Sequence, residues 1–162
     1  MNHGIAMVNY QLKRVAVRST AGLSELSDLI HDEAFEVAAV DFDSKLGVVT
    51  IPFRRIYHGG PERLIQKTIF SRKREVDVLR AFIRIKHVTD AKIIDTEKIG
   101  TYTFDKVAFE TETSQLVFMA CPKFLLRFRV SSLAIEYEET QFAGKVLITD
   151  GWCWQRSRFV LF

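Results

Sequence analysis

The stretch VAFETETSQLVFMACPKFLLRFRVSSLAIEY, residues 107–137, decides the fold class of this chain. Apolar and polar residues alternate along it in three runs, which include Val107, Leu126 and Ile135 on their apolar sides. A period of two is typical of strands that bury one face of a pleated sheet and expose the other to water. The stretch therefore predicts three successive strands of a sheet-dominated protein.

Helical spacing is confined to short segments. Apolar residues recur at the spacing of a helix over about residues 22–32. Pro61 is a favoured first residue of a helix, so an inserted helix and loop are predicted at about residues 60–75. The sequence thus predicts an α+β fold: a mostly antiparallel β-sheet or partly closed barrel of eight or more strands, with one or two short helices packed on it.

Length and composition predict one globular domain over residues 1–162. The chain is 48% hydrophobic, and its three Pro and eight Gly form no stretch typical of a flexible linker. No segment has the apolar run of a signal peptide or of a membrane span. Without an export signal, Cys121 and Cys153 are expected to be reduced thiols, and the protein is expected to be cytoplasmic.

Two segments of the chain show a weak similarity to each other. Residues 37–53 and 107–123 share five identities at an offset of 70, and each contains a strand, a polar turn, a second strand and a proline. Hairpin chemistry alone can produce such a match, since repeat architectures normally show stronger self-similarity. Duplication therefore stays the less favoured interpretation.

Signatures of catalysis are missing from the sequence. It has no phosphate-binding glycine motif, no GxSxG turn, and no HxH, HxxxH or CxxC spacing of metal ligands. We therefore expect no cofactor and no metal site, and we favour a protein that is not an enzyme. One enzymatic alternative stays open, a small hydrolase that uses His58 or His87 with a strand carboxylate. The candidate carboxylates are Asp41, Asp43, Glu110 and Glu112.

Positive charge is concentrated in one segment. Residues 54–92 carry eleven basic and four acidic side chains, a net of +7, in a chain whose net charge is +3. Such a segment suits an anionic ligand or nucleic acid, because guanidinium groups bind phosphate through two donors. The candidate binding residues are Arg54, Arg55, Arg63, Lys67, Arg72, Lys73, Arg74, Arg80, Arg84 and Lys86.

A second interpretation of these basic residues is charge pairing inside the sheet. Basic strands alternate with acidic ones along the chain, and cross-strand pairs of opposite charge stabilise a sheet. In particular, Arg127 and Arg129 are expected to balance Glu136 and Glu138, which follow after one short loop. This interpretation weakens the prediction of a nucleic-acid surface.

The C-terminal segment is unusually aromatic. Its apolar side chains are suited either to the core or to an interface, where aromatic residues are enriched. The candidate interface residues are Trp152, Trp154, Phe159 and Phe162. The leading functional hypothesis is accordingly a small binding protein, of the kind found among bacterial adaptors, that acts through a protein partner or as a homodimer. Binding of an anionic ligand or nucleic acid is the first alternative, and the hydrolase is the second.

Overall fold

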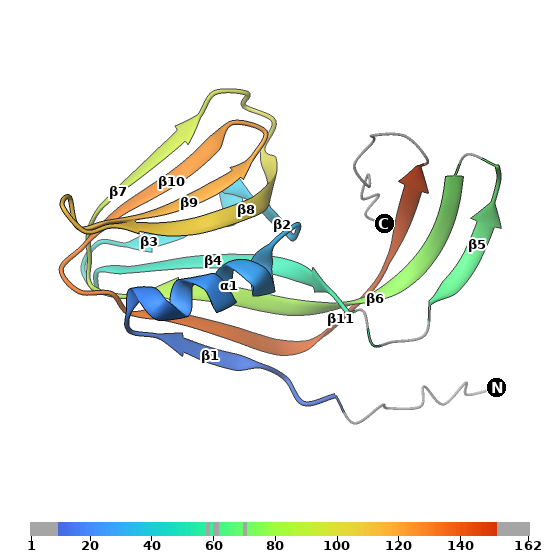
Figure 1. Cartoon of the computed structure of the whole chain (residues 1–162), viewed down its shortest axis with the longest axis horizontal. Helices are drawn as coiled ribbons and strands as arrows, with labels where there is room; N and C mark the ends of the chain where they lie inside the picture. The colour runs from blue at the N-terminus through green and yellow to red at the C-terminus, as the bar shows by residue number, and fades with distance from the viewer. Residues whose placement is uncertain (1–9, 58, 60–61, 70, 152–162) are drawn as a thin grey trace.

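The computed structural model describes residues 10–57, 59, 62–69 and 71–151. Within them it contains eleven strands, the α-helix α1 (Leu23–Ile30) and two 3-10 turns, Thr20–Gly22 and Val37–Ala39 (Figure 1). The strands are β1 (Arg14–Val17), β2 (Ala34–Glu36), β3 (Asp41–Asp43), β4 (Val48–Ile56), β5 (Arg63–Lys67), β6 (Ser71–Ile85), β7 (Val88–Asp95), β8 (Thr101–Glu110), β9 (Gln115–Cys121), β10 (Phe124–Val130) and β11 (Ile135–Gly151).

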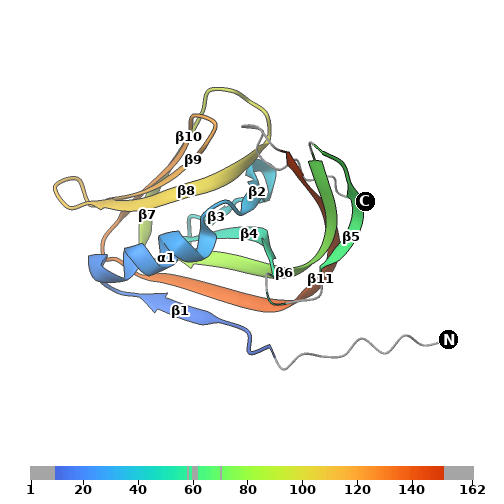
Figure 2. The same cartoon turned by 45° about the vertical axis from the view of Figure 1, so that its right-hand side comes forward.

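All eleven strands belong to one antiparallel sheet. Its main path runs β1-β11-β6-β4-β2-β8-β9-β10-β7, with β3 added beside β4 and β5 beside β6. The sheet folds over, so that β7, β8, β9 and β10 lie across from β4, β6 and β11, and α1 lies along one open side (Figures 1 and 2). Strands β1 and β7 are the two ends of the path and do not pair with each other, so the sheet is not closed and a partly closed barrel is not confirmed.

The main hydrophobic core fills the space between the two halves of the folded sheet. Phe35 of β2 stacks on Phe104 of β8 with ring centroids 4.3 Å apart, and Tyr102 stacks on Phe124 at 4.1 Å. Such pairs add stability beyond the area that they bury. The helix predicted over about residues 22–32 is α1, which buries Leu23, Leu26 and Ile30 against this core. Gly22 precedes it as the N-cap and offers no side-chain hydrogen bond.

The alternation in residues 107–137 is confirmed as strand structure. Leu126, Phe128 and Val130 of β10 are buried in the core, whereas Arg129 is exposed on the other face of the strand. The predicted pairing of Arg127 and Arg129 with the glutamates of β11 is wrong, because β10 pairs with β7 and β9 and β11 pairs with β1 and β6. Glu136 instead contacts Lys86, Arg84 and Arg18, while Glu138 contacts Arg14.

The predicted helix at about residues 60–75 is also wrong, since this segment forms β5 and the beginning of β6. The apolar side of the predicted helix was Leu64, Ile65 and Ile69. All three side chains are exposed, so they do not pack against the core. The hairpin is closed by Thr68, whose N–H donates to the carbonyl of Ser71 over 2.8 Å. The N–H of Ser71 in turn donates to the Thr68 hydroxyl over 2.9 Å.

We call residues 62–69, 71–78 and 143–151 the arm. There β5, the first half of β6 and the last part of β11 extend away from the main core (Figures 1 and 2). A second, small hydrophobic cluster of Val76, Val78, Val146 and Ile148 lies at the base of the arm, with Ile56 packed against it. The main core lies on the other face of β6, where it buries Ile83 and Ile85. Strand β6 therefore supplies opposite faces to two cores.

The two similar segments are not equivalent in the structure. Leu46 lies in the turn before β4 and is 74% exposed, whereas Leu116 is fully buried in β9. Pro52 lies in the middle of β4, whereas Pro122 follows β9 in a turn. The offset of 70 therefore does not align the two hairpin turns. In the part of the chain that the structure describes, no helix is long and apolar enough to cross a membrane.

Candidate functional site

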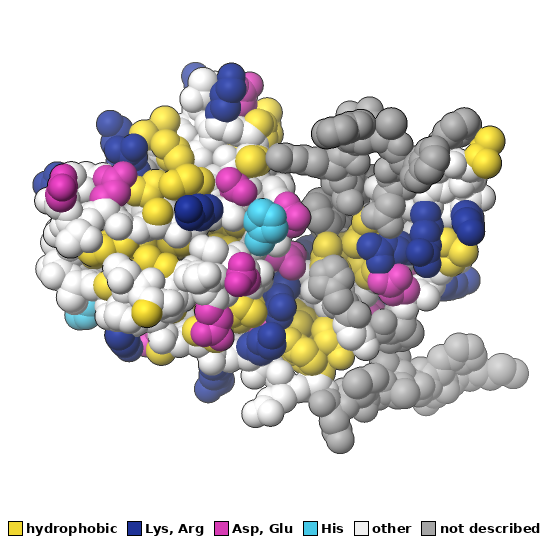
Figure 3. All heavy atoms as spheres, in the orientation of Figure 1, with side chains coloured by type: hydrophobic (Ala, Val, Ile, Leu, Met, Phe, Trp, Pro, Cys, Tyr) yellow, Lys and Arg dark blue, Asp and Glu magenta, His cyan; other side chains and the backbone are white. Residues whose placement is uncertain are grey.

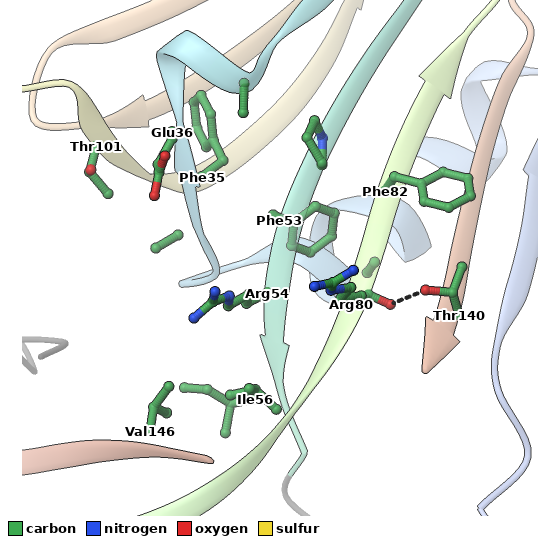
Figure 4. Close-up of a pocket in the computed structure, with 15 residues that line it drawn as sticks. Phe35, Glu36, Phe53, Arg54, Ile56, Arg80, Phe82, Thr101, Thr140 and Val146 are labelled. Atoms are coloured by element: carbon green, nitrogen blue, oxygen red, sulfur yellow. Dashed lines mark hydrogen bonds between the residues drawn. The ribbon is translucent and has the colours of Figure 1, made fainter. Parts of the chain in front are cut away.

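A groove of about 880 Å³ lies where the arm meets the main sheet (Figure 4). Strands β2, β4 and β6 form most of its wall, and the arm adds Val78 and Val146. Ten of its fifteen lining residues are apolar, which is typical of sites that bind small molecules. The lining residues are Ala34, Phe35, Glu36, Ala39, Pro52, Phe53, Arg54, Ile56, Val78, Arg80, Ala81, Phe82, Thr101, Thr140 and Val146.

Two arginines lie side by side in this groove. Arg54 of β4 is the direct cross-strand partner of Arg80 of β6, so the two side chains project from the same face. Cβ atoms of such partners are about 5 Å apart, and like charges in these positions destabilise a sheet. Among the described residues, neither guanidinium has an ion-pair partner, and both side chains are exposed. Figure 4 shows Arg54 extending into the groove between Glu36 and Val146.

Neighbouring residues of the sheet contact the strand segments that carry the two arginines. The hydroxyl of Thr140 donates to the carbonyl of Arg80 over 3.3 Å. Next along the sheet, Pro52 pairs with Phe82, and the Arg84 guanidinium lies 4.9 Å from the centre of the Phe82 ring. The two arginines therefore lie between the apolar pairs Pro52–Phe82 and Ile56–Val78. The groove wall also contains the polar residues Glu36, Thr101 and Thr140.

The other predicted basic residues are divided among three places. Arg55 points to the opposite face of β4 and forms a buried ion pair with Glu139. Arg84 and Lys86 contact Glu136, and Arg74 contacts Glu62. Together with Arg55, these three basic residues form ion pairs within the fold. Four residues remain on the arm without an ion pair among the described residues: Arg63, Lys67, Arg72 and Lys73. The structure thus does not bring the ten predicted residues together on one surface.

A buried carboxylate occupies the core face of β11. Glu139 is 1% exposed and accepts hydrogen bonds from the Tyr10 hydroxyl at 2.6 Å, the Lys13 N–H at 2.8 Å and the Tyr137 hydroxyl at 2.7 Å. Its other contact is the ion pair with Arg55. Burial by itself would raise the pKa of Glu139, but these donors and the nearby guanidinium hold it below the ordinary value. Burial and the bond to Glu139 raise the pKa of Tyr10 to about 12.

A second buried carboxylate lies close to this cluster. Glu33, 6% exposed, follows α1 and accepts a hydrogen bond from the N–H of Ile56 at 3.1 Å. Burial raises the pKa of Glu33 to about 8, against the opposing effects of the Ile56 N–H and of Arg55. Beside Arg55, a smaller pocket of about 280 Å³ is lined by Tyr10, Lys13, Ile56, Tyr57 and Gly59. Tyr10 and Arg55 of the polar cluster line it, and its lining has no described carboxylate.

The residues of the hydrolase alternative are not brought together by these pockets. His87 lies exposed in the turn between β6 and β7, and neither it nor Asp41, Asp43, Glu110 or Glu112 lines the two pockets described above. His58 lies outside the described residues. Among the described residues, no group of three or more His, Cys, Asp or Glu side chains is placed to hold a metal ion. The interface candidates Trp152, Trp154, Phe159 and Phe162 also lie outside the described residues, as does Cys153.

Sequence reasoning missed both buried glutamates, although one of them had a signal. Glu139 has the same parity as Ile135 and Tyr137, so continued alternation would have placed it on the core face of β11. Glu33 follows a helix end and has no comparable periodic signal. The pairing of Arg54 with Arg80 depends on strand register, which two separated strands do not reveal by themselves.

Comparison of this chain with protein-family models, with curated proteins and with solved structures found no match in any of the three.

Proposed function

We propose that this protein is a non-enzymatic binding protein whose groove binds an anionic ligand with an apolar body. The observation that carries the proposal is the pair of Arg54 and Arg80, placed directly opposite each other on the groove wall. Glu36 also lines the groove, but among the described residues neither arginine forms an ion pair. A sheet gains nothing in stability from two like charges in these positions. A carboxylate or phosphate between the two guanidinium groups would turn this repulsion into charge-assisted hydrogen bonds.

The apolar lining supports an amphipathic ligand over a free inorganic anion. Ile56, Val78 and Val146 extend the groove away from the arginines toward the arm. An alkyl or aryl body placed there would leave water, which contributes about 0.8 kcal/mol for each buried methylene group. The cavity volume is within the range of about 300–1,000 Å³ that is typical of small-molecule sites.

The test uses decanoate as an amphipathic anion and inorganic phosphate as a charge without an apolar body. Isothermal titration of the full chain is expected to give binding of decanoate and much weaker binding of phosphate. The double variant Arg54→Gln/Arg80→Gln should lower the affinity for decanoate by about tenfold or more, since it removes two charged donors. The matched control is Arg129→Gln, an exposed arginine of β10 that does not line the groove.

Thermal unfolding of the same variants separates loss of binding from loss of folding. The double variant should be at least as stable as the unaltered protein, because it removes a repulsive cross-strand pair. Absence of decanoate binding by the unaltered protein, or an equal loss of affinity in Arg129→Gln, would reject the groove as an anion site.

We retain the function first predicted from the sequence, association with a protein partner or a second copy, as a second proposal. Phe142 of β11 supports it, since this large apolar side chain is 52% exposed while its ring packs edge-on against Tyr57 at 5.7 Å. Strand β11 continues from there to Gly151, directly before the aromatic C-terminal segment. A cytoplasmic location remains part of this proposal.

A further inference from the structure

The end of the arm carries a run of basic residues that is flanked by Glu62 and Glu75, of which Glu62 pairs with Arg74. From Arg63 to Arg74 there are five basic residues and no Asp or Glu. In the hairpin, Lys67 lies directly opposite Arg72, so two cations share one cross-strand position. Both side chains are exposed, and among the described residues neither has an ion-pair partner. On its other side Arg72 is the cross-strand partner of Asp150 of β11, so one acidic position stands beside two cationic ones and a net positive charge remains.

Aliphatic side chains accompany these cations. Ile69, in the turn of the hairpin, is 86% exposed, and Leu64 and Ile65 of β5 are 49% and 44% exposed. Figure 3 shows Lys and Arg side chains gathered on the arm, with hydrophobic side chains toward its end. Figures 1 and 2 show the turn between β5 and β6 standing clear of the main sheet. The end of the arm can therefore meet a broad surface before the rest of the described chain does.

We propose that the end of the arm docks on a membrane surface that contains anionic phospholipids. The cations Lys67 and Arg72, which share one face of the hairpin, contact the headgroups, while Ile69 enters the boundary between headgroups and acyl chains. This combination of basic residues with exposed aliphatic ones is typical of interfacial membrane binding. A single-stranded nucleic acid would also satisfy the cations, but it is bound mainly through aromatic stacking, whereas the exposed apolar residues described at the end of the arm are aliphatic. The proposal does not depend on the groove or its ligand.

Cosedimentation with vesicles tests the docking. The full chain is mixed with phosphatidylcholine vesicles that contain about 30% phosphatidylserine, or none, at about 50 mM and about 500 mM salt. We expect binding to the anionic vesicles at low salt, a large loss at high salt, and little binding to pure phosphatidylcholine. Lys67→Ser/Arg72→Ser should lower the partition coefficient by about 10- to 30-fold, since each surface cation contributes roughly fivefold. Ile69→Ser should lower it by about fivefold.

A matched control comes from the turn at the opposite end of the sheet. Lys45 and Leu46 are a basic and an aliphatic residue, both exposed, in the turn between β3 and β4, and Lys45→Ser/Leu46→Ser should leave the partition coefficient unchanged. Circular dichroism of each variant verifies that the fold is retained. Equal losses in the control and arm variants would overturn the proposal. So would absence of vesicle binding by the unaltered protein, including the case in which it binds a labelled 20-nucleotide single strand instead.

Discussion

Glu33 and Glu139 are both buried, yet their surroundings shift their pKa values in opposite directions. Glu139 accepts three hydrogen bonds and an ion pair, which together outweigh the cost of burying its charge. Among the described residues, Glu33 accepts hydrogen bonds only from the Ile56 N–H. Burial is therefore the largest effect on its pKa and raises it. The two carboxylates should therefore affect stability in different ranges of pH.

Glu33→Gln is expected to make the protein more stable at neutral and alkaline pH. The folded pKa of about 8 lies above the unfolded value of 4.5, so the native state holds a proton that the unfolded state has lost. The stability that this proton contributes is complete below the unfolded pKa and is lost as pH rises toward about 8. At about pH 8 the variant should exceed the unaltered protein by about 3 kcal/mol in the free energy of unfolding, as measured by urea denaturation.

Glu139→Gln supplies the contrasting variant in the same experiment. Because the folded pKa of Glu139 is lowered, its contribution is present above the unfolded value and is lost as pH falls through the folded one. The variant should lose about 3 kcal/mol at neutral pH, since Arg55 is left half-buried without its partner, and less under acidic conditions. A difference between Glu33→Gln and the unaltered protein that stays constant between about pH 5 and about pH 8 would contradict the assignment.

At the scale of elements, one turn depends on glycine for two separate reasons. Gly47, between β3 and β4, has a φ of 62°, and its carbonyl accepts a hydrogen bond from the Val88 N–H at 2.9 Å. A Cβ atom at this position would lie 2.9 Å from the Val88 carbonyl oxygen. This contact joins the turn to the first residue of β7. Gly100 also has a positive φ, of 80°, but a Cβ there would meet nothing within 4 Å.

The pair Gly47→Ala and Gly100→Ala separates backbone conformation from close contact. Gly100→Ala should cost about 1 kcal/mol in the free energy of unfolding, the typical penalty for a left-handed non-glycine residue. Gly47→Ala should cost about 2–4 kcal/mol, since the Val88 carbonyl must also move. Chemical denaturation of both variants measures the difference, and equal costs would show that the contact with Val88 is unimportant.

Alternation along the chain predicted the strands where one face of the sheet covers the main core. It failed at residues 60–75, because the hairpin of the arm buries little and its β5 residues are all exposed. Without a buried face, Leu64, Ile65 and Ile69 carry no period that distinguishes a strand from a helix. Pro61 then favoured the helical interpretation, although the cross-strand register with β6 decides the conformation of the segment that follows.

At the scale of the whole molecule, pairing between distant strands creates the sites. The groove needs β2 beside β4 and β4 beside β6, and the cluster at Glu139 needs residue 10 near residue 139. The sequence predicted an anion-binding surface made of the basic residues in segment 54–86. It could not predict that Arg54 and Arg80 meet in a groove while Arg55 turns to the opposite face, since a register shift of one residue exchanges the two faces of a strand.

For the whole molecule we also predict an oligomeric state, a dimer formed through the C-terminal segment. Deletion of Phe159–Phe162 should then increase the elution volume on size-exclusion chromatography, without loss of the strand signal in circular dichroism. The apolar composition of this segment is the reason for the expectation. An unchanged elution volume, or an unfolded product, would argue against an interface at the C-terminus.

Strands β6 and β11 each continue from the arm into the main sheet. Strand β6 runs unbroken from Ser71 to Ile85, so no linker lets the arm rotate freely. Bending is easiest where the β11–β6 ladder changes register, between Glu139 and Gln141 and again between Phe142 and Gly144. Gln141 is the cross-strand partner of Arg80. Val146 of the arm also lines the groove, so a change in the angle between the arm and the main sheet would change the shape of the groove.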